Sequence, residues 1–511
     1  MLTHIKDHND AEGSTEAKRK AIVIGSGFGG LATAVRLCAK GYQVDVVEKL
    51  DGPGGRAYVI KQDGFVFDTG PTIITAPWLL DELWELCGKK VSDDIDLREL
   101  TPFYDVRFDD GSVFTLSRDK EDMRRQIAEI SPEDVDNFDR FMARSKEIYK
   151  YGFEDLANVS FDTLKPMLKA APHIIALGGL RTVFGQVSKF IRHPKLRIAL
   201  SLHPLLIGGN PYSVTSIYCL INYLESNWGV HFAMGGTGKL VEGLVGLIEM
   251  QGGKMHYSRE VDRINVAAGR ASGVTLRDGT VMDADIVVSN ADAAWTYDKL
   301  LPDVKRKKRW TPRRIKNTRY SMGLFVWYFG TSRQFTDVPH HSMVLGPRFK
   351  GLLKDIFTHK RLSDDFSMYL HRPTATDPSM APKGCDTFYA LVPVPHLDAN
   401  VNWSTEGEKL RDRVEQRLEE TVLPGLGDTI VTSTYVTPKD FETRLNSFKG
   451  AGFGPEPVIW QSAFFRPHNR SEEVDGLYMV GASTHPGAGI PGVITSARVV
   501  SERIPHAREL V

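Results

Sequence analysis

The sequence predicts a mixed α/β (α+β) fold in which a nucleotide-binding unit is interrupted by other segments, and three observations support this. Residues 21–25 form an apolar run that is typical of a buried parallel strand. A glycine motif, a helical stretch and a second apolar strand follow in order. A second glycine-dense turn, within residues 476–496, again joins a strand to a helix. We therefore expect one ligand site assembled from both ends of the chain.

The first turn carries the dinucleotide fingerprint in its required context. Gly25, Gly27 and Gly30 are spaced G-x-G-x-x-G before a helix expected over 31–40. The first glycine makes the tight turn, the second admits a pyrophosphate, and the third lets the helix pack on the strand. Glu48 closes the second strand and is expected to accept hydrogen bonds from an unphosphorylated ribose. A glycine-rich loop without a nucleotide is the alternative, and the combination of strand, helix, second strand and acid argues against it.

A further motif, Gly54-Gly55-Arg56-Ala57, is not needed by nicotinamide dehydrogenases. It resembles the GG-R-A motif of the flavin-dependent amine oxidase superfamily, where a further loop and an arginine secure FAD. Arg56 suits a diphosphate because its planar fork can bind pairs of oxygen atoms. A surface salt bridge is the alternative for this residue.

The segment 476–496 predicts a strand over 477–480, a glycine-dense turn and a helix that begins near Gly492. Glycine allows the backbone to approach a ligand closely because it has no Cβ. A helix N-terminus adds free N–H groups and a partial positive charge. We expect this end of the helix to lie near N1 of a flavin, which carries negative charge when reduced.

Bulk properties exclude several classes of function. A chain of 511 residues suffices for two or three domains, and 41% hydrophobic with 25% charged residues is ordinary for a soluble globular protein. The net charge is zero, so nothing global indicates nucleic-acid binding. The four cysteines form no CxxC pair, which argues against a zinc site or a disulfide framework and fits a reducing cytosol. Residues 1–20 are polar and predict a disordered leader, and no run approaches the roughly 18 apolar residues of a spanning helix.

The predicted elements divide the chain into a split FAD-binding domain, a split substrate-binding domain and one helical insert. The boundaries are 21–75, 235–295 and 455–511 for the first, 76–162 and 300–454 for the second, and 163–234 for the insert. Strands are expected over 104–108, 113–115, 254–257, 261–266, 271–276, 286–289, 322–329 and 387–392, and helices over 81–88, 131–149, 240–251 and 406–421.

The insert has an unusual charge distribution. Residues 163–224 contain no Asp or Glu but seven Lys or Arg, with apolar clusters between them. This pattern favours docking on an anionic bilayer surface. The alternative is a core-lining helical subdomain whose basic residues are solvated. Nucleic-acid binding is disfavoured because few aromatic residues are interleaved with the basic ones.

Residues 20–505 resemble the bacterial- and fungal-type phytoene desaturases of carotenoid biosynthesis. The resemblance rests on GSGFGG at 25–30, GPGGRAY at 52–58, LIGGNPYSVTSIY at 206–218, WGVHFAMGGTGK at 228–239, and the HPGAGIPG core within 476–496.

The resemblance implies a Rossmann-like FAD-binding domain of the two-dinucleotide flavoprotein or amine oxidase type, with a membrane-associating helical insert. It implies FAD as cofactor, no metal, and stepwise dehydrogenation of the C40 hydrocarbon 15-cis-phytoene to all-trans-lycopene or neurosporene. It also implies a peripheral position on the inner, cytoplasmic face of the cell membrane, with oxygen or a quinone as electron acceptor and no nucleic-acid partner. The oligomeric state stays open.

The motifs and the resemblance together name the site residues. Contacts to FAD are expected from Gly25, Ser26, Gly27, Phe28, Gly29, Gly30, Glu48, Lys49, Gly55, Arg56, Thr72, Val261, Gly481, Gly489, Ile490 and Val493. The catalytic base is left open. His485 and Lys169 are candidates, with a turn-stabilising histidine and a lipid-facing cation as the alternatives. Tyr212, Tyr218 and His203 are candidates for the wall of a substrate channel.

Three other functions compete with this interpretation. Another carotenoid flavoprotein would share the N-terminal motifs: a diapophytoene, ζ-carotene or hydroxyneurosporene desaturase, an isomerase or a retinol saturase. The matches at 206–239 and 476–496 favour phytoene desaturase over these. A soluble amine oxidase would need a flavin-linked or aromatic-cage arrangement near the C-terminus, which the sequence lacks. A non-catalytic flavin-binding membrane protein is disfavoured by the intact glycine motifs.

Overall fold

The structure is a computed structural model, and it describes residues 19–306 and 309–509. The leader predicted for residues 1–20 therefore lies outside the described residues, apart from its last two. The first strand begins at Lys20.

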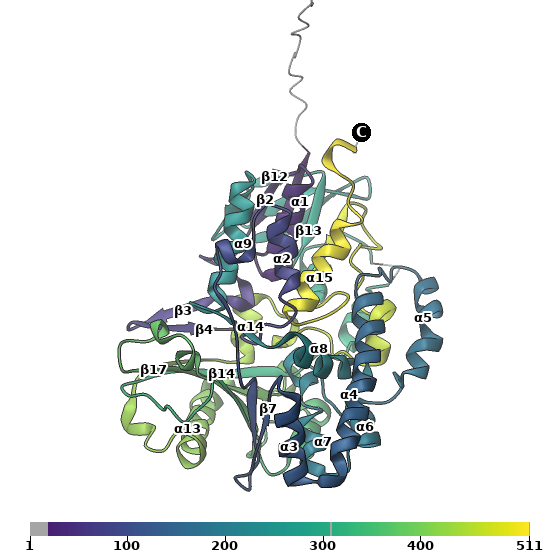
Figure 1. The fold of residues 1–511 in the computed structure, drawn as a ribbon. Helices are drawn as coiled ribbons and strands as arrows, with labels where there is room; N and C mark the ends of the chain where they lie inside the picture. The colour runs from purple at the N-terminus through teal and green to yellow at the C-terminus, as the bar shows by residue number, and fades with distance from the viewer. Residues whose placement is uncertain (1–18, 307–308, 510–511) are drawn as a thin grey trace, which may run out of the picture.

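A five-stranded parallel sheet, in the order β19-β13-β1-β2-β9, occupies the upper part of the molecule in Figure 1. Its strands are β1 (Lys20–Ile24), β2 (Gln43–Val47), β9 (Lys254–His256), β13 (Ile286–Ser289) and β19 (Leu477–Met479). Three widely separated stretches of the chain contribute them, and parallel pairing brings their carboxyl ends to one edge. In open α/β sheets that edge is where ligands bind.

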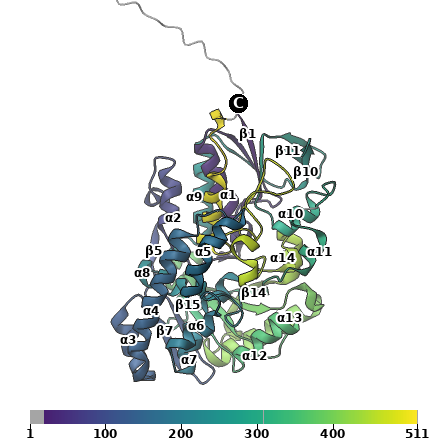
Figure 2. The same ribbon diagram turned by 90° about the vertical axis from the view of Figure 1, so that its right-hand side faces the viewer.

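Both faces of this sheet are covered, which explains why its central strands are apolar throughout. On β1, Ala21 and Val23 pack into the cluster that contains helix α1, whereas Ile22 and Ile24 pack on the opposite side. The helices of the first side are α1 (Phe28–Ala39), α2 (Trp78–Glu85), α9 (Thr237–Met250) and α15 (Ile490–Ser501). The other face is covered by an antiparallel meander of β10 (Val261–Ala267), β11 (Arg270–Leu276) and β12 (Val281–Asp283), as Figure 2 shows.

A second, seven-stranded mixed sheet crosses the lower part of the molecule, in the order β18-β14-β17-β16-β15-β6-β7. Its strands are β6 (Tyr104–Arg107), β7 (Val113–Leu116), β14 (Gly323–Thr331), β15 (His341–Val344), β16 (Met368–His371), β17 (Asp386–Val394) and β18 (Ile430–Val436). Helix α13 (Trp403–Thr421) packs on one face of it. Two short ribbons complete the strands: β3 (Val59–Gln62) with β4 (Phe65–Asp68), and β5 (Leu97–Glu99) with β8 (His231–Ala233).

A group of helices flanks the second sheet on the right of Figure 1. It consists of α3 (Lys120–Ile130), α4 (Val135–Tyr149), α5 (Leu164–Ala176), α6 (Val183–Phe190), α7 (Pro194–Ala199) and α8 (Leu220–Trp228). Helix α5 lies at the outer edge of this group (Figure 1). The other helices are α10 (Ala293–Lys299), α11 (Pro312–Asn317), α12 (Phe349–Lys354) and α14 (Pro438–Leu445). The division into domains stays a prediction.

Several predicted boundaries are wrong by a few residues. Helix α1 begins at Phe28 and α15 at Ile490, in both cases earlier than predicted, because residues of the glycine motifs already belong to the helices. The helix predicted over 131–149 is not continuous. A 3-10 turn over Pro132–Asp134 precedes α4, and the Ser131 hydroxyl donates to the Asp134 carboxylate at 3.1 Å.

The packing of α1 on β1 makes Gly30 a sensitive position. A Cβ at Gly30 would lie 2.0 Å from the carbonyl oxygen of Gly25. We expect Gly30→Ala to cost about 1–3 kcal/mol in stability, because the backbone must move to relieve the overlap. The matched control is Gly246→Ala in α9, where nothing lies within 4 Å of the added methyl. There we expect a gain of about 0.5–1 kcal/mol. Thermal melting compares the two, and a Gly30→Ala midpoint at or above the wild-type value would contradict the packing argument.

Candidate functional site

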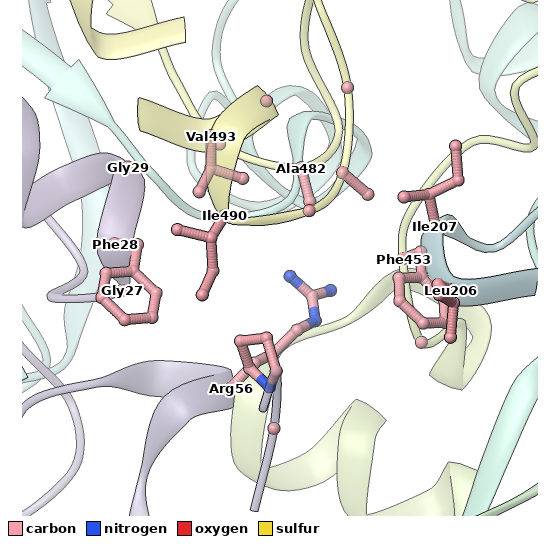
Figure 3. Close-up of a pocket in the computed structure, with 18 of the residues that line it drawn as sticks. Gly27, Phe28, Gly29, Arg56, Leu206, Ile207, Phe453, Ala482, Ile490 and Val493 are labelled. Carbon is pink, nitrogen blue, oxygen red and sulfur yellow. The ribbon is translucent and has the colours of Figure 1, made fainter. Parts of the chain in front are cut away.

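A cavity of about 550 Å³ lies between the carboxyl edge of the parallel sheet and the second sheet. Figure 3 shows that residues from both ends of the chain converge on it. It has two parts of different character. Glycines and charged residues line the part beside the parallel sheet, and aliphatic and aromatic side chains line the rest.

Asn290 is the centre of the glycine-rich part. It follows β13, and its Nδ2 donates to the carbonyl oxygen of Gly25 at 3.5 Å. An added Cβ would lie 2.9 Å from this amide at Gly27, 2.7 Å at Gly29 and 2.6 Å at Gly481. Three glycines are therefore needed for the backbone of both ends of the chain to surround one side chain. The sequence interpretation missed Asn290, although a polar residue directly after a central parallel strand is a recognisable signal.

Glu48 is held rigidly at the end of β2. Its Oε2 accepts from the backbone N–H of Ser26 at 2.8 Å and from the Ser26 hydroxyl at 2.7 Å. Its Oε1 accepts from the N–H of Leu50 at 2.9 Å. A carboxylate offers about four acceptor positions, so capacity is left for the hydroxyls of a ribose. Ser26 itself does not line the cavity and acts by orienting Glu48.

Arg56 projects its guanidinium group into the cavity (Figure 3). One nitrogen, Nη2, donates to the Ser447 hydroxyl at 2.9 Å, whereas Nε has no hydrogen-bond partner among the described residues. Burial lowers the pKa of Arg56, and the carboxylate of Asp292 opposes this effect. A buried N–H group without an acceptor is costly, so the site fits an anionic group that brings oxygen atoms to Arg56.

The turn before α15 forms the opposite wall. Gly489 precedes the helix with φ = 92°, a conformation that favours glycine. Ile490 and Val493 extend from the first turn of α15 toward the cavity (Figure 3). The positive end of the helix dipole therefore lies beside the same space as Arg56.

Arg466, which the sequence interpretation did not single out, holds this turn in place. Arg466 is 1% exposed, and its guanidinium group donates to three carbonyl oxygens. The distances are 3.3 Å to Pro455, 2.7 Å to Ala482 and 2.9 Å to Thr484. Burial lowers the pKa of Arg466. No local sequence motif predicts the role of Arg466, because the carbonyl groups that it binds lie 11 to 18 positions away in the sequence.

His485 lines the cavity but is a poor proton acceptor. Burial, followed by the nearby Arg466 charge, lowers the pKa of His485 to about 3, against the opposing effect of the Ala157 and Val159 backbone. The ring packs edge-on against Phe161 with centroids 5.0 Å apart. The imidazole is therefore neutral at physiological pH, and its protonated form is disfavoured.

The structure brings most of the other predicted site residues together. Fourteen of the sixteen line the cavity: Gly25, Gly27, Phe28, Gly29, Glu48, Lys49, Gly55, Arg56, Thr72, Val261, Gly481, Gly489, Ile490 and Val493. The two others are Ser26 and Gly30, which position the backbone around it. Their roles toward a cofactor stay predictions.

Of the four remaining candidates for the base or the substrate channel, three do not line the cavity. Lys169 is exposed on α5 and is not among the lining residues, because its side of the helix faces outward. This position does not support Lys169 as a candidate for the catalytic base. Tyr218 lines the cavity, whereas Tyr212 packs on Phe184 with ring centroids 4.5 Å apart, and His203 lies behind the wall.

The apolar part of the cavity is built largely from the segment around α8 and from the second sheet. Leu206, Ile207 and Phe453 lie at this end in Figure 3. The other aliphatic and aromatic lining residues include Leu205, Ile217, Leu220, Ile221, Leu224, Met343, Leu345 and Phe349. Such a wall favours a hydrocarbon over a polar ligand.

One group of side chains among the described residues has the spacing of a metal site. It consists of His340, His341 and His371, all buried, with ring nitrogens within 4.8 Å of one another. Hydrogen bonds already use several of these nitrogens: His340 Nε2 lies 3.1 Å from His371 Nε2, and His341 Nδ1 lies 2.6 Å from the Tyr369 hydroxyl. Burial lowers the pKa of all three histidines.

Comparison with known proteins places this arrangement in a family. The model of the flavin containing amine oxidoreductases matches residues 28–505. The solved structure of cyclohexylamine oxidase from Brevibacterium oxydans has a TM-score of 0.61 at 17% identity, covering 96% of this chain and 99% of that one. These matches confirm the predicted amine oxidase-type fold with its flavin-binding part.

Relatives with higher sequence identity show to which branch of this family the chain belongs. The neurosporene-forming phytoene desaturase of Rhodobacter capsulatus is 48% identical over 97% of this chain and 95% of its own length. The lycopene-forming phytoene desaturase of Paracoccus sp. is 45% identical over 95% of this chain and 97% of its own. This chain therefore belongs to the phytoene desaturases, a branch of the flavin-containing amine oxidoreductase family.

Proposed function

We propose that this protein is an FAD-dependent desaturase that converts 15-cis-phytoene stepwise into neurosporene or all-trans-lycopene. The observation that carries the proposal is the two-part cavity. One part offers an anion site and a rigid carboxylate to a dinucleotide, and the other offers a hydrocarbon wall in direct continuation. The names of the relatives supply the identity of the hydrocarbon.

FAD fits the residues of the first part. Arg56 and the positive end of α15 would bind the diphosphate and the isoalloxazine edge, and Glu48 would bind the ribose. Val261, at the start of β10, would meet the adenine through its backbone. Gly27, Gly29 and Gly481 bring the main chain to the wall of the cavity, where the cofactor would approach it.

The reaction removes a hydride and a proton from a –CH2–CH2– unit beside a double bond. When bound, oxidised flavin supplies the hydride acceptor, since no ordinary side chain can take a hydride. The carbocation left on the substrate is allylic, and the growing polyene stabilises it. The protein's part is to hold the chain in line and to exclude water, which the apolar wall around α8 accomplishes. Oxygen or a quinone would then reoxidise the cofactor.

Helix α5 supports a peripheral membrane position. Met167 and Ile174 on its inner face line the cavity. Its outer face exposes Leu164, Leu168 and Ile175, which are 47%, 64% and 54% accessible. Apolar residues at this spacing, together with the exposed Lys165 and Lys169, suit the boundary between lipid headgroups and acyl chains. Among the described residues, no helix combines the length and the apolar character needed to span a bilayer.

The basic residues of the insert are partly neutralised in the folded chain, which its sequence did not reveal. Arg192 pairs with Glu133 at 2.8 Å, and Lys195 pairs with Asp110. Both acids lie outside the acid-free stretch. The docking surface proposed here is therefore the outer face of α5 and not the basic cluster of Lys189, Arg192 and Arg197.

Removal of Arg56 tests the cofactor. In Arg56→Met we expect FAD to bind at least about tenfold more weakly, because charge-assisted hydrogen bonds to the diphosphate are lost. Titration calorimetry on the flavin-free protein measures this affinity. Arg98→Met is the control, since Arg98 is an exposed partner of Asp96 away from the cavity. Equal affinity in Arg56→Met and wild type would refute the assignment of the diphosphate.

Product analysis tests the substrate. Expressed in a phytoene-accumulating bacterial strain, the protein should yield pigment whose HPLC retention and spectrum match neurosporene or lycopene. Incubation of purified protein with phytoene, without oxygen and with or without a quinone, identifies the electron acceptor. Unchanged phytoene together with conversion of a C30 precursor or of ζ-carotene would favour a different carotenoid flavoprotein.

Flotation tests the membrane surface. We expect a variant with Leu164, Leu168 and Ile175 all changed to Ser to float less with anionic liposomes, because each apolar Å² removed costs about 25 cal/mol of insertion energy. The control is a variant with Val281 and Val431 both changed to Ser, since these two residues are exposed on parts of the surface away from α5. If the α5 variant floats as well as wild type while retaining flavin, α5 is not the docking surface.

A further inference from the structure

The reaction proposed above releases a proton inside an apolar cavity, and the residues discussed so far do not receive it. His485 is disfavoured as an acceptor, and Lys169 lies outside the cavity. Within the described part of the chain, four carboxylates line the cavity. Three of them belong to the nucleotide-binding part, and each has a partner there. Glu48 accepts from Ser26, Glu260 lies near Lys49, and Asp292 lies near Arg56.

The fourth carboxylate is Glu225, and it lies in the apolar wall. It belongs to α8, whose neighbouring residues Leu220, Ile221 and Leu224 also line the apolar part. The Glu225 side chain is only 4% exposed. A buried carboxylate costs free energy unless it is hydrogen-bonded. A hydrocarbon ligand offers it no hydrogen bond, so substrate binding does not explain why a carboxylate lies here.

Glu225 forms a triangle with Tyr104 and His203, which are both 2% exposed. Its Oε2 lies 3.1 Å from His203 Nε2 and accepts a hydrogen bond from the Tyr104 hydroxyl. The Tyr104 hydroxyl also lies 2.9 Å from His203 Nε2. Burial and the Glu225 charge raise the pKa of Tyr104 well above its usual range, so the phenol stays protonated and orients the carboxylate.

A second cavity, of about 310 Å³, lies behind this triangle. Its lining includes His203 and Glu225 together with Arg118, Lys120, Lys146 and Ser226. Glu225 therefore lies in the wall between the hydrocarbon cavity and a second cavity, whose lining is largely apolar but includes these charged groups. The other ring nitrogen of His203, Nδ1, is buried without a hydrogen-bond partner among the described residues.

We infer that Glu225 is the proton acceptor of the desaturation. This rests on the proposed function. One carbon of the substrate loses a hydride, for which a bound flavin would supply the acceptor. The neighbouring C–H bond then breaks. Its electron pair forms the new C=C bond, and the proton goes to the Glu225 carboxylate. Because the Tyr104 hydroxyl donates to Glu225, His203 Nε2 carries a hydrogen and donates to the same carboxylate. Tyr104 and His203 are therefore positioning residues, and Glu225 is the catalytic one.

The first test compares Glu225→Gln with Glu242→Gln. Glu242 is an exposed carboxylate of α9 that pairs with Lys239 at 2.7 Å and lines neither cavity. The rate of phytoene consumption is measured in a single anaerobic turnover, alongside flavin content and melting temperature. We expect a loss of about 10²- to 10⁴-fold in Glu225→Gln with flavin retained, and a wild-type rate in Glu242→Gln. A Glu225→Gln rate within tenfold of wild type would overturn the assignment.

Chemical rescue separates catalysis from structure. In Glu225→Ala the space of the lost carboxylate is open to formate, which should restore desaturation, whereas chloride at equal ionic strength should not. Equal rates in the two salts would count against Glu225 as the acceptor.

A measurement on the wild-type chain covers the case in which these variants do not fold. An apolar carbodiimide labels carboxyl groups in hydrophobic surroundings, and peptide mass mapping locates the label. We expect labelling at Glu225 to parallel the loss of turnover, while flavin stays bound. Complete labelling at Glu225 with an unchanged rate would exclude the proposal. If unlabelled wild type consumes no phytoene at all, the proposed function fails, which is a separate result.

Discussion

The backbone around Asn290 sets the geometry on which the site depends. Gly27 and Gly29 from the first turn and Gly481 from the last approach one amide so closely that a methyl group at any of them would lie within 3 Å of it. This contact joins the start of the chain to its end, and the parallel pairing of β1, β13 and β19 keeps it in place. The buried Arg466 completes the constraint by fixing the carbonyl groups of the turn before α15.

The same constraint explains why two chemically different spaces share one cavity. The carboxyl edge of the parallel sheet supplies rigid polar groups such as Glu48 and Arg56, and the long segments between its strands supply the apolar wall. A ligand that spans both spaces places its reactive end where the two meet. The apolar wall contains few polar residues, and for this reason Glu225 stands out there as the proposed proton acceptor.

Local patterns in the sequence predict the parts of the site that depend on neighbouring residues. The glycine motif, Glu48 and Arg56 lie within a short stretch, and the structure places Glu48 and Arg56 on the cavity as expected. Asn290, Arg466 and the triangle of Tyr104, His203 and Glu225 could not be found in this way, because their partners are brought together only by the fold. Charge patterns fail for a related reason. The acid-free stretch looks strongly basic, yet Arg192 and Lys195 meet acids from other segments.

The membrane docking proposed for helix α5 would couple the bilayer surface to the cavity. One helix forms both an outer apolar face and a wall of the cavity, through Leu168 on one side and Met167 and Ile174 on the other. To the extent that a surface shifts α5, it alters the cavity, and thermodynamic linkage makes the effect reciprocal. Binding of the substrate in the cavity must then change the affinity of the protein for the membrane surface by the same factor. Substrate-bound and substrate-free protein would therefore distribute differently between membrane and water, and the substrate itself would regulate membrane binding.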